Sequence, residues 1–287
     1  MGECLFVSDL HGRIGRYEKL FERIAVEGPE AVFLGGDLLP MPFDGSWASD
    51  RDGADFLDDF LVPALAGLRG RMAGRYPRLF LILGNDDSRS VEPALEAAEA
   101  AGIWTYIHNR RVDMGTFPVY GYACVPPTPF AWKDWERYDV SRYVDPGCVS
   151  PEEGLRSVPV PPHEIRHGTI AADLAALAPQ GGLENAILLF HSPPYRTRLD
   201  RAALDGRVID HVPVDVHVGS IAIRRFIETE QPRITLHGHI HESARLTGSW
   251  RDRIGRTHLF SAAHDGPELA LVRFRPEDPG AAVRTLV

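Results

Sequence analysis

Short apolar runs alternate with amphipathic stretches along the first third of this chain. The runs Cys4–Ser8, Ala31–Leu34 and Leu79–Leu83 have the length and composition of buried β-strands. Next to them, Ile14–Val26 and Glu92–Ala101 carry apolar residues at the spacing of a helix face. Strands that alternate with helices in this way predict a parallel sheet with right-handed crossovers.

Further helices and strands are expected along the rest of the chain. They are helices Asp52–Arg71, Ile165–Leu177 and Ser220–Glu230, and strands Ala186–Phe190, Arg233–Leu236, Thr257–Ala262 and Leu269–Phe274. The glycine-containing turn His264–Pro267 predicts that the last two strands form a hairpin.

A proline-rich, aromatic stretch at about 126–162 separates two runs of strands. Its lack of periodicity predicts an ordered insertion, which is either a surface excursion packed by its own aromatic side chains or a substrate lid. The two runs of strands favour an α/β fold in which helices cover two sheets. With 287 residues and 44% hydrophobic content, we expect one domain over residues 1–287.

Charge and cysteine content narrow the class of protein. The net charge is −9 and the basic residues are dispersed, so we expect neither a nucleic-acid polymer nor a membrane as partner. Cys4, Cys124 and Cys148 are too few for a disulfide framework. The first strand begins almost at Met1 and no apolar run is long enough to span a membrane, so we expect a cytoplasmic protein.

Seven side chains of the types that bind metal ions occur where predicted strands end, each group beginning within two residues of an apolar run. They are Asp9, His11, Asp37, Asn85, His191, His239 and His241. Carboxylate, amide and imidazole donors of this kind hold two adjacent divalent ions in hydrolases. An anionic substrate would find there the positive charge that the rest of the chain lacks.

Each motif is weak when taken alone. Asp9 and His11 can turn toward one ion, and Gly12 lets the backbone leave sharply. Asp37 has two oxygens that can bridge two ions, although aspartate after glycines is common in turns. Asn85 is more telling, because asparagine is an unusual choice at a strand end unless its oxygen serves as a neutral ligand; the structural alternative is an Asx turn. Five such groups in this order are not explained by structural roles.

The order D-x-H, G-D, G-N-x-D, a strand-end histidine and G-H-x-H resembles the calcineurin-like metallophosphoesterase superfamily over about residues 4–262. The resemblance implies a four-layer sandwich of two mixed β-sheets flanked by α-helices. It divides the ligands as follows: Asp9, His11 and His241 on one ion, Asn85, His191 and His239 on the other, and Asp37 bridging both.

One position departs from the superfamily pattern. Many members have a histidine after the asparagine, which is thought to protonate the leaving oxygen, but this chain has Asp86. The chain is similar here to bacterial and archaeal phosphodiesterases that lack this histidine. An ionised Asp86 would repel a phosphate dianion more than a diester, which modestly favours diesters. Asp86, if protonated, or His217 could supply the proton instead.

The segment 195–220 is the candidate substrate-facing loop. It begins just after His191 and carries Arg196 and Arg198 as candidate phosphate contacts, although a solvated basic turn is an equal alternative. Arg89, just beyond Asn85, is a weaker candidate.

We therefore expect metal-assisted hydrolysis of a small phosphate ester, with Mn²⁺, Fe or Zn²⁺ as cofactors and with Asp37, Asp86 and His217 as catalytic candidates. The first hypothesis is a phosphodiesterase acting on small diesters such as cyclic nucleotides. The alternatives are a phosphomonoesterase acting on nucleotides or phosphoproteins, and an inactive scaffold that serves as a binding module. The sequence leaves the oligomeric state open.

Overall fold

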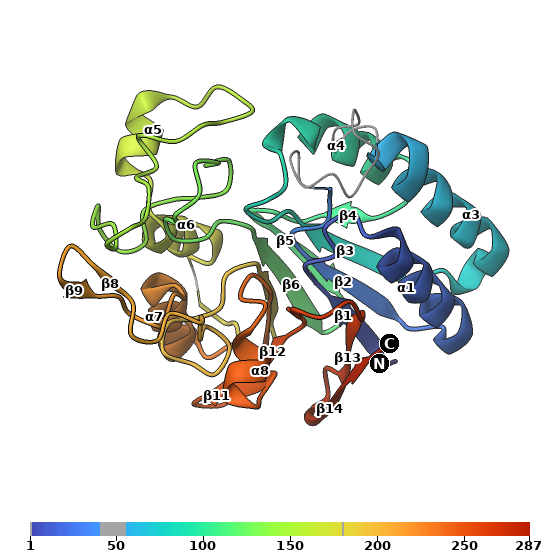
Figure 1. Ribbon diagram of the computed structural model, residues 1–287. Coiled ribbons are helices and arrows are strands. Elements are labelled where there is room, and N and C mark those ends of the chain that lie inside the picture. Colours follow the sequence, from blue (N-terminus) through green and yellow to red (C-terminus); the bar gives the residue numbers. More distant parts are fainter. Residues whose placement is uncertain (1, 41–55, 180) are drawn as a thin grey trace.

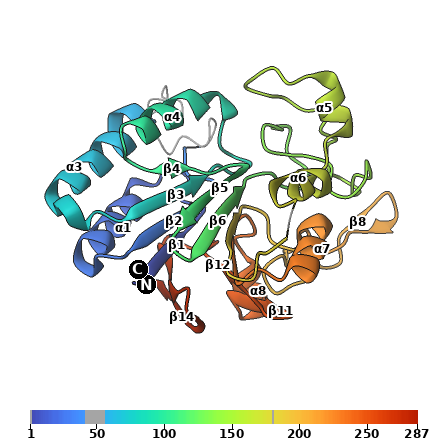
Figure 2. The same ribbon diagram turned by 180° about the vertical axis from the view of Figure 1, so that it is seen from behind.

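The computed structural model describes residues 2–40, 56–179 and 181–287. Two six-stranded sheets lie face to face, and helices cover the outer side of each (Figure 1). The two termini lie side by side at the same end of the sheets, which the reverse view also shows (Figure 2). The expected architecture of two mixed sheets flanked by helices is confirmed.

The first sheet has the strand order β14-β13-β1-β2-β3-β4. Strands β1 to β4 run parallel, whereas β13 and β14 are antiparallel to their neighbours. The bounds are β1 Cys4–Val7, β2 Ala31–Gly35, β3 Arg78–Ile82, β4 Thr105–Tyr106, β13 Ala270–Arg275 and β14 Asp278–Leu286. The three central strands are buried almost throughout, as expected for strands covered on both faces.

The second sheet has the order β11-β12-β10-β7-β6-β5, with four parallel central strands and an antiparallel strand at each edge. Its bounds are β5 Arg110–Met114, β6 Phe117–Tyr122, β7 Ile187–Phe190, β10 Ile234–His237, β11 Arg251–Ile254 and β12 Thr257–Ser261. A separate pair, β8 Val208–Ile209 and β9 Val212–Pro213, forms a small hairpin.

Helices α1, α3 and α4 lie against the first sheet, and α6 and α7 against the second (Figures 1 and 2). The helical segments are α1 Ile14–Glu27, η1 Leu57–Leu61, α3 Val62–Met72, η2 Ala73–Arg75, η3 Arg89–Val91, α4 Glu92–Ala100, α5 Pro162–His167, α6 Ile170–Leu177, α7 Ile221–Glu230 and α8 Ser243–Thr247. Among the described residues, no helix combines the length and apolar character that crossing a bilayer requires.

The parallel strands end in register, and this alignment positions the site. Val7 pairs with Leu34 on β2, and Gly35 pairs with Ile82 on β3. In the second sheet, Leu189 pairs with Leu236. The segments that follow these strands therefore emerge at one edge of each sheet, where the two sheets face each other.

The predicted hairpin of the last two expected strands is wrong. Strand β12 runs parallel to β10 in the second sheet, whereas β13 pairs with β1 in the first. The turn at 264–267 carries the chain from one sheet to the other, and β13 forms its hairpin with β14. Apolar patterns report burial on a sheet but do not say which of two sheets receives the strand.

Other boundaries also differ from the expectation. The helix predicted at 165–177 is two helices, because Gly168 and Thr169 are extended and the Thr169 hydroxyl caps α6 by accepting from the Ala172 amide (3.1 Å). The start of the helix predicted at 52–71 lies outside the described residues. Strands β4 to β6, β11 and β14 and helix α8 were not predicted.

The insertion at 126–162 has no regular helix or strand before α5 begins at Pro162. It is nevertheless held in place by buried contacts. Lys133 and Glu136 form an ion pair that is almost fully buried. The Trp135 indole is buried and donates to the carbonyl of Asp87 (2.9 Å), which follows strand β3. The insertion therefore packs against the loops at the strand ends.

Candidate metal centre

The seven expected donors come from strand ends in both sheets. Asp9, Asp37 and Asn85 follow β1, β2 and β3, and His191 and His239 follow β7 and β10. His11 and His241 lie two residues beyond Asp9 and His239. Because the strands end in register, these side chains converge between the two sheets.

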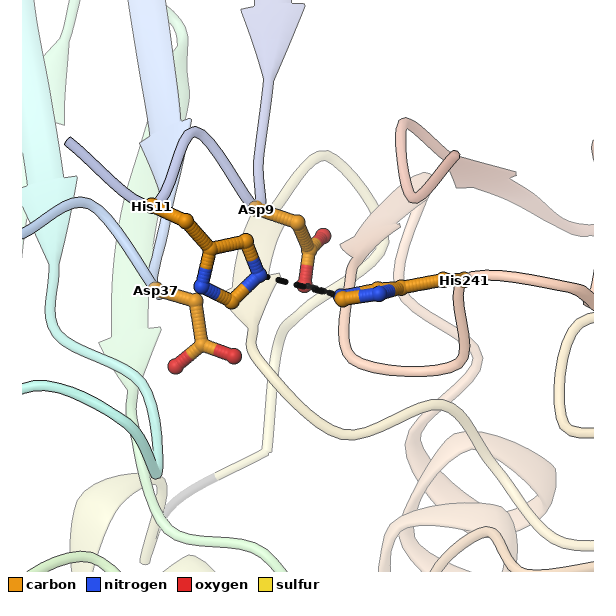
Figure 3. A group of neighbouring side chains, drawn as sticks. All are labelled: Asp9, His11, Asp37 and His241. Atoms are coloured by element: carbon orange, nitrogen blue, oxygen red, sulfur yellow. Dashed lines mark hydrogen bonds and ion pairs between the residues drawn. The ribbon is translucent and has the colours of Figure 1, made fainter. Parts of the chain in front are cut away.

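One group of donors consists of Asp9, His11, Asp37 and His241, whose ligand atoms all lie within 4.8 Å of one another (Figure 3). The His241 Nε2 lies 3.2 Å from both the Asp9 Oδ1 and the His11 Nε2. The His11 Nδ1 is buried and has no hydrogen-bond partner among the described residues. Two imidazole nitrogens that converge on a carboxylate form a donor set suited to a divalent ion.

A second group consists of Asp37, His191 and His239, again within 4.8 Å. The His191 Nδ1 donates to the Gly35 carbonyl (2.8 Å), which turns its Nε2 toward the Asp37 Oδ2 (3.2 Å) and the Asn85 Oδ1 (3.1 Å). In many metal sites, a ligating histidine donates its other ring N–H to a backbone carbonyl, which fixes the tautomer and orientation of the ring. Asp37 belongs to both groups, so the arrangement fits two ions that share one carboxylate.

The backbone at the cluster is strained. Asp9, His11, Asp37 and His239 have φ values between 47° and 72°, a left-handed region that non-glycine residues rarely occupy. Such a conformation costs on the order of 1–3 kcal/mol per residue and is typical of functional sites. Burial and the surrounding hydrogen bonds, including Asp9 amide to Gly36 carbonyl (2.9 Å), maintain it.

Two glycines permit this close packing. Gly36 has a φ of 91°, and a β-carbon there would lie 2.6 Å from the His191 Nδ1. A β-carbon on Gly84 would lie 2.3 Å from the Asp37 Oδ1. Any side chain at either position would displace a candidate ligand, which explains the glycines before Asp37 and Asn85.

Carboxylates and imidazoles in the cluster shift one another's pKa values. Burial opposes ionisation of Asp9, but the hydrogen bond from His241 and the nearby His191 and His11 outweigh it and hold the pKa of Asp9 below its usual range. Burial lowers the pKa of His239 to about 3. Burial also disfavours the charged form of His191, but Asp37 beside it raises the pKa of His191 to about 10. Metal binding would therefore release a proton from His191.

Asp86 lies at the edge of the cluster. Its Oδ2 is 3.6 Å from the His11 Nδ1, and its Oδ1 accepts from the side-chain Nδ2 of Asn85 (2.8 Å). Burial, with Asp37 and Asp87 nearby, raises the pKa of Asp86 to about 8.

Asp87 and Arg16 support the cluster and were missed from the sequence. Asp87 is fully buried and accepts hydrogen bonds from the amides of Leu38, Leu39 and Gly84 (2.8–3.1 Å). Buried Arg16 donates to the Asp9 carbonyl (2.6 Å). The position of Asp87 within G-N-D-D was the available signal, but nothing marked Arg16 within its helix.

Among the described residues, the candidates in the loop at 195–220 form no hydrogen bond or ion pair with the seven donors. The His217 Nδ1 bonds the Asp200 Oδ1 (2.9 Å), and the Arg196 guanidinium lies 5.2 Å from the centre of the Tyr195 ring. The Arg198 amide donates to Asp252 (2.8 Å).

Arg89, the remaining substrate-contact candidate, is engaged elsewhere. Its guanidinium pairs with Glu92 (2.9 Å) and lies 5.3 Å from the centre of the Trp135 ring. It lines a cavity of ≈ 130 Å³ formed with the insertion.

Comparison with known proteins gives the family. A model of the calcineurin-like phosphoesterase family matches residues 4–243. An uncharacterised protein of Methanocaldococcus jannaschii is 42% identical over 77 residues, which cover 26% of this chain and 29% of the length of that relative.

Several solved structures share the fold, including one from Thermus thermophilus and one from Danio rerio. The crystal structure of TT1561 of Thermus thermophilus has a TM-score of 0.56 and 16% identity, covering 99% of this chain and 98% of that one. A dimetal phosphatase from Danio rerio has a TM-score of 0.52 and 11% identity, covering 94% and 91% of the two chains. At these identities the likeness extends to the fold alone.

Proposed function

This chain belongs to the calcineurin-like phosphoesterase family, and on that premise we propose that it is a phosphodiesterase that hydrolyses small phosphate diesters such as cyclic nucleotides. Hydrolysis of phosphate esters follows from the family, and the paired donor groups indicate a dinuclear site for divalent ions. The preference for diesters and the roles of individual residues are our proposal.

The observation that carries the proposal is the membership of Asp37 in both donor groups. We assign Asp9, His11 and His241 to one ion, Asn85, His191 and His239 to the other, and Asp37 to both. The mixture of carboxylate, amide and imidazole donors suits Mn²⁺, Fe or Zn²⁺. When bound, two such ions supply Lewis-acid charge to the phosphoryl oxygens and make water a competent nucleophile near neutral pH.

Asp86 supports the choice of a diester. It stands beside His11 at the edge of the donor groups, where many relatives have an imidazole. Neither protonation state of Asp86 offers the positive charge with which an imidazolium would attract a phosphate dianion. A diester carries one negative charge less, so it loses less from this exchange. We assign to Asp86 the proton donated to the leaving oxygen, because Asp86 lies 3.6 Å from the candidate ligand His11, whereas the described residues show no hydrogen bond or ion pair between His217 and the seven donors.

Metal analysis and a substrate panel test the proposal. The purified protein should carry about two transition-metal ions per chain, and chelation should abolish hydrolysis that Mn²⁺ then restores. Matched mono- and diesters with one leaving group should show higher kcat/KM for the diester. A protein that binds no metal when ions are added contradicts the dinuclear site. A higher kcat/KM for the monoester contradicts the diester assignment and favours the phosphomonoesterase.

A further inference from the structure

A second feature of the molecule is a cavity of ≈ 480 Å³ between the insertion and the segment at 195–221. Its walls are mainly apolar and include Pro126, Val140, Tyr143, Leu204 and Val214. The volume is in the range of small-molecule sites, which are typically about 300–1,000 Å³. Both walls come from segments outside the two sheets, on the side of the molecule that carries α6 and α7 (Figure 1).

Both walls of the cavity begin a few residues after strand ends at the candidate metal centre. The wall residue Tyr195 is four residues beyond His191, and the wall residue Pro126 is four residues beyond Tyr122. The His191 amide donates to the Tyr122 carbonyl (3.2 Å), so both walls start from neighbouring points at the strand ends. Four residues span at most roughly 14 Å. The Tyr195 part of the cavity wall therefore lies within that distance of the candidate ligand His191.

The charges in the walls disfavour a second anionic group. Asp139, Asp145 and Asp215 line the cavity with Arg207, so three carboxylates face one guanidinium group. Asp139 accepts hydrogen bonds from the first amides of α7, and Asp215 accepts from the Tyr195 hydroxyl (2.6 Å). Most of the other side chains in the wall are apolar or aromatic.

His217 adds one oriented polar atom to the wall. Asp200 is fully buried and accepts hydrogen bonds from the amides of Arg196, Thr197 and Gly219 as well as from the His217 ring. A carboxylate in this setting acts as an acceptor, so the His217 Nδ1 is the donor, and the Nε2 of the neutral ring is an acceptor that has no hydrogen-bond partner among the described residues. The wall can thus accept one hydrogen bond from a ring substituent.

We infer that this cavity binds an uncharged aromatic group of the phosphate-diester substrate, with His217 as an acceptor for a donor on the ring. A nucleobase has this chemistry. The inference rests on the proposed function for the phosphate end of the substrate. In this inference, the insertion and the 195–221 segment determine which organic group is accepted, and the metal centre binds the phosphate.

The test compares two valines on the same segment. Val214 lines the cavity, whereas Val212 is 49% exposed and is not among the residues that line it. Val214→Trp should fill the cavity, and Val212→Trp is the matched control with the same added bulk. Calorimetry with the metal-loaded protein measures the affinity of diphenyl phosphate relative to dimethyl phosphate for each variant.

In the wild type, diphenyl phosphate should bind roughly 10- to 100-fold more tightly, as expected for burying one aromatic ring. Val214→Trp should remove most of that preference, and Val212→Trp should retain it. Equal affinities in the wild type, or equal losses in the two variants, would overturn the inference.

Hydrolysis gives an independent readout. Phenyl and methyl 4-nitrophenyl phosphate release the same leaving group, so a difference in KM reports the other ester group. We expect the lower KM for the phenyl ester in the wild type and in Val212→Trp, and a loss of that advantage in Val214→Trp. If no phosphate ester is hydrolysed but the binding preference persists, the proposed function fails and the cavity assignment stands. If esters are hydrolysed without any preference for the phenyl group, only the cavity assignment fails.

Discussion

Two carboxylates that accept main-chain hydrogen bonds show how differently two regions of this molecule are built. Asp87 is fully buried and joins the loops after β2 and β3, which carry candidate ligands. Asp139 is partly exposed and joins the insertion to the start of α7, where it accepts from the Ser220 hydroxyl and the Ile221 amide. The first holds the metal centre and the second holds a wall of the apolar cavity.

The difference indicates how substitutions should act. The metal centre is fixed by buried main chain, close glycines and strained residues, so few changes are tolerated without loss of the site. The cavity is formed by segments with little regular structure that are anchored at a few points. We expect changes there to alter which organic group is accepted while the chemistry is retained.

The largest expected effect is that of Asp37→Asn. An amide at the shared position lacks the negative charge that stabilises both ions, so metal occupancy should fall. The value of kcat/KM should decrease by more than about 100-fold, which exceeds the loss typical for a residue that only hydrogen-bonds a metal ligand. Metal analysis and kinetics measure both. The control is Asp205→Asn, which removes a carboxylate whose side chain is 69% exposed on the 195–220 segment. Wild-type occupancy in the Asp37 variant would contradict the shared ligand.

Asp87→Ala should come next. Removing the carboxylate leaves three buried amides without acceptors, which should lower the free energy of unfolding by about 3 kcal/mol. The displaced loops should also weaken metal binding. Chemical denaturation and metal titration measure the two effects. Asp87→Asn keeps one oxygen acceptor, so its stability and metal affinity should lie between those of the wild type and of Asp87→Ala. An unchanged stability of Asp87→Ala would show that other groups fix these loops.

Asp139→Ala should lower stability less than Asp87→Ala does, and it should affect the cavity rather than the metal centre. Loss of a carboxylate at the start of α7 should cost about 1 kcal/mol of stability, since the helix retains the Ser220 cap. Metal occupancy should not change, while the preference for diphenyl over dimethyl phosphate should fall. If Asp139→Ala lost metal to the same extent as Asp87→Ala, the two regions would not be separable.

The smallest expected effect is that of Asp86→His. An imidazolium there would add a proton donor and a positive charge beside the phosphate, so the ratio of kcat/KM for a monoester to that for its matched diester should rise by about tenfold, below the full value of general acid catalysis. The comparison is made at equal metal occupancy. A ratio that stays at the wild-type value would mean that Asp86 is not where the proton is transferred.

The sequence alone predicted the donor set of the candidate metal centre. Metal-binding side chains at the ends of apolar runs predict a common edge, because parallel strands aligned in register bring their ends together. The structure brings six of the seven together in the two groups that share Asp37, and the Oδ1 of the seventh, Asn85, lies 3.1 Å from the His191 Nε2. The alternation of strands and helices likewise determined the architecture of two covered sheets.

Only the tertiary structure decided which sheet each late strand joins and what the loops do. Strands β12 and β13 have similar apolar patterns, yet they belong to different sheets, because their partners are far away in sequence. For the same reason, His217 and Arg89 could not be placed from their charge alone. The sequence of the aromatic insertion shows no helix or strand periodicity. The cavity between the insertion and the 195–221 segment is evident only in the folded structure. Local patterns report burial and chain direction, whereas pairing and cavities depend on contacts between distant segments.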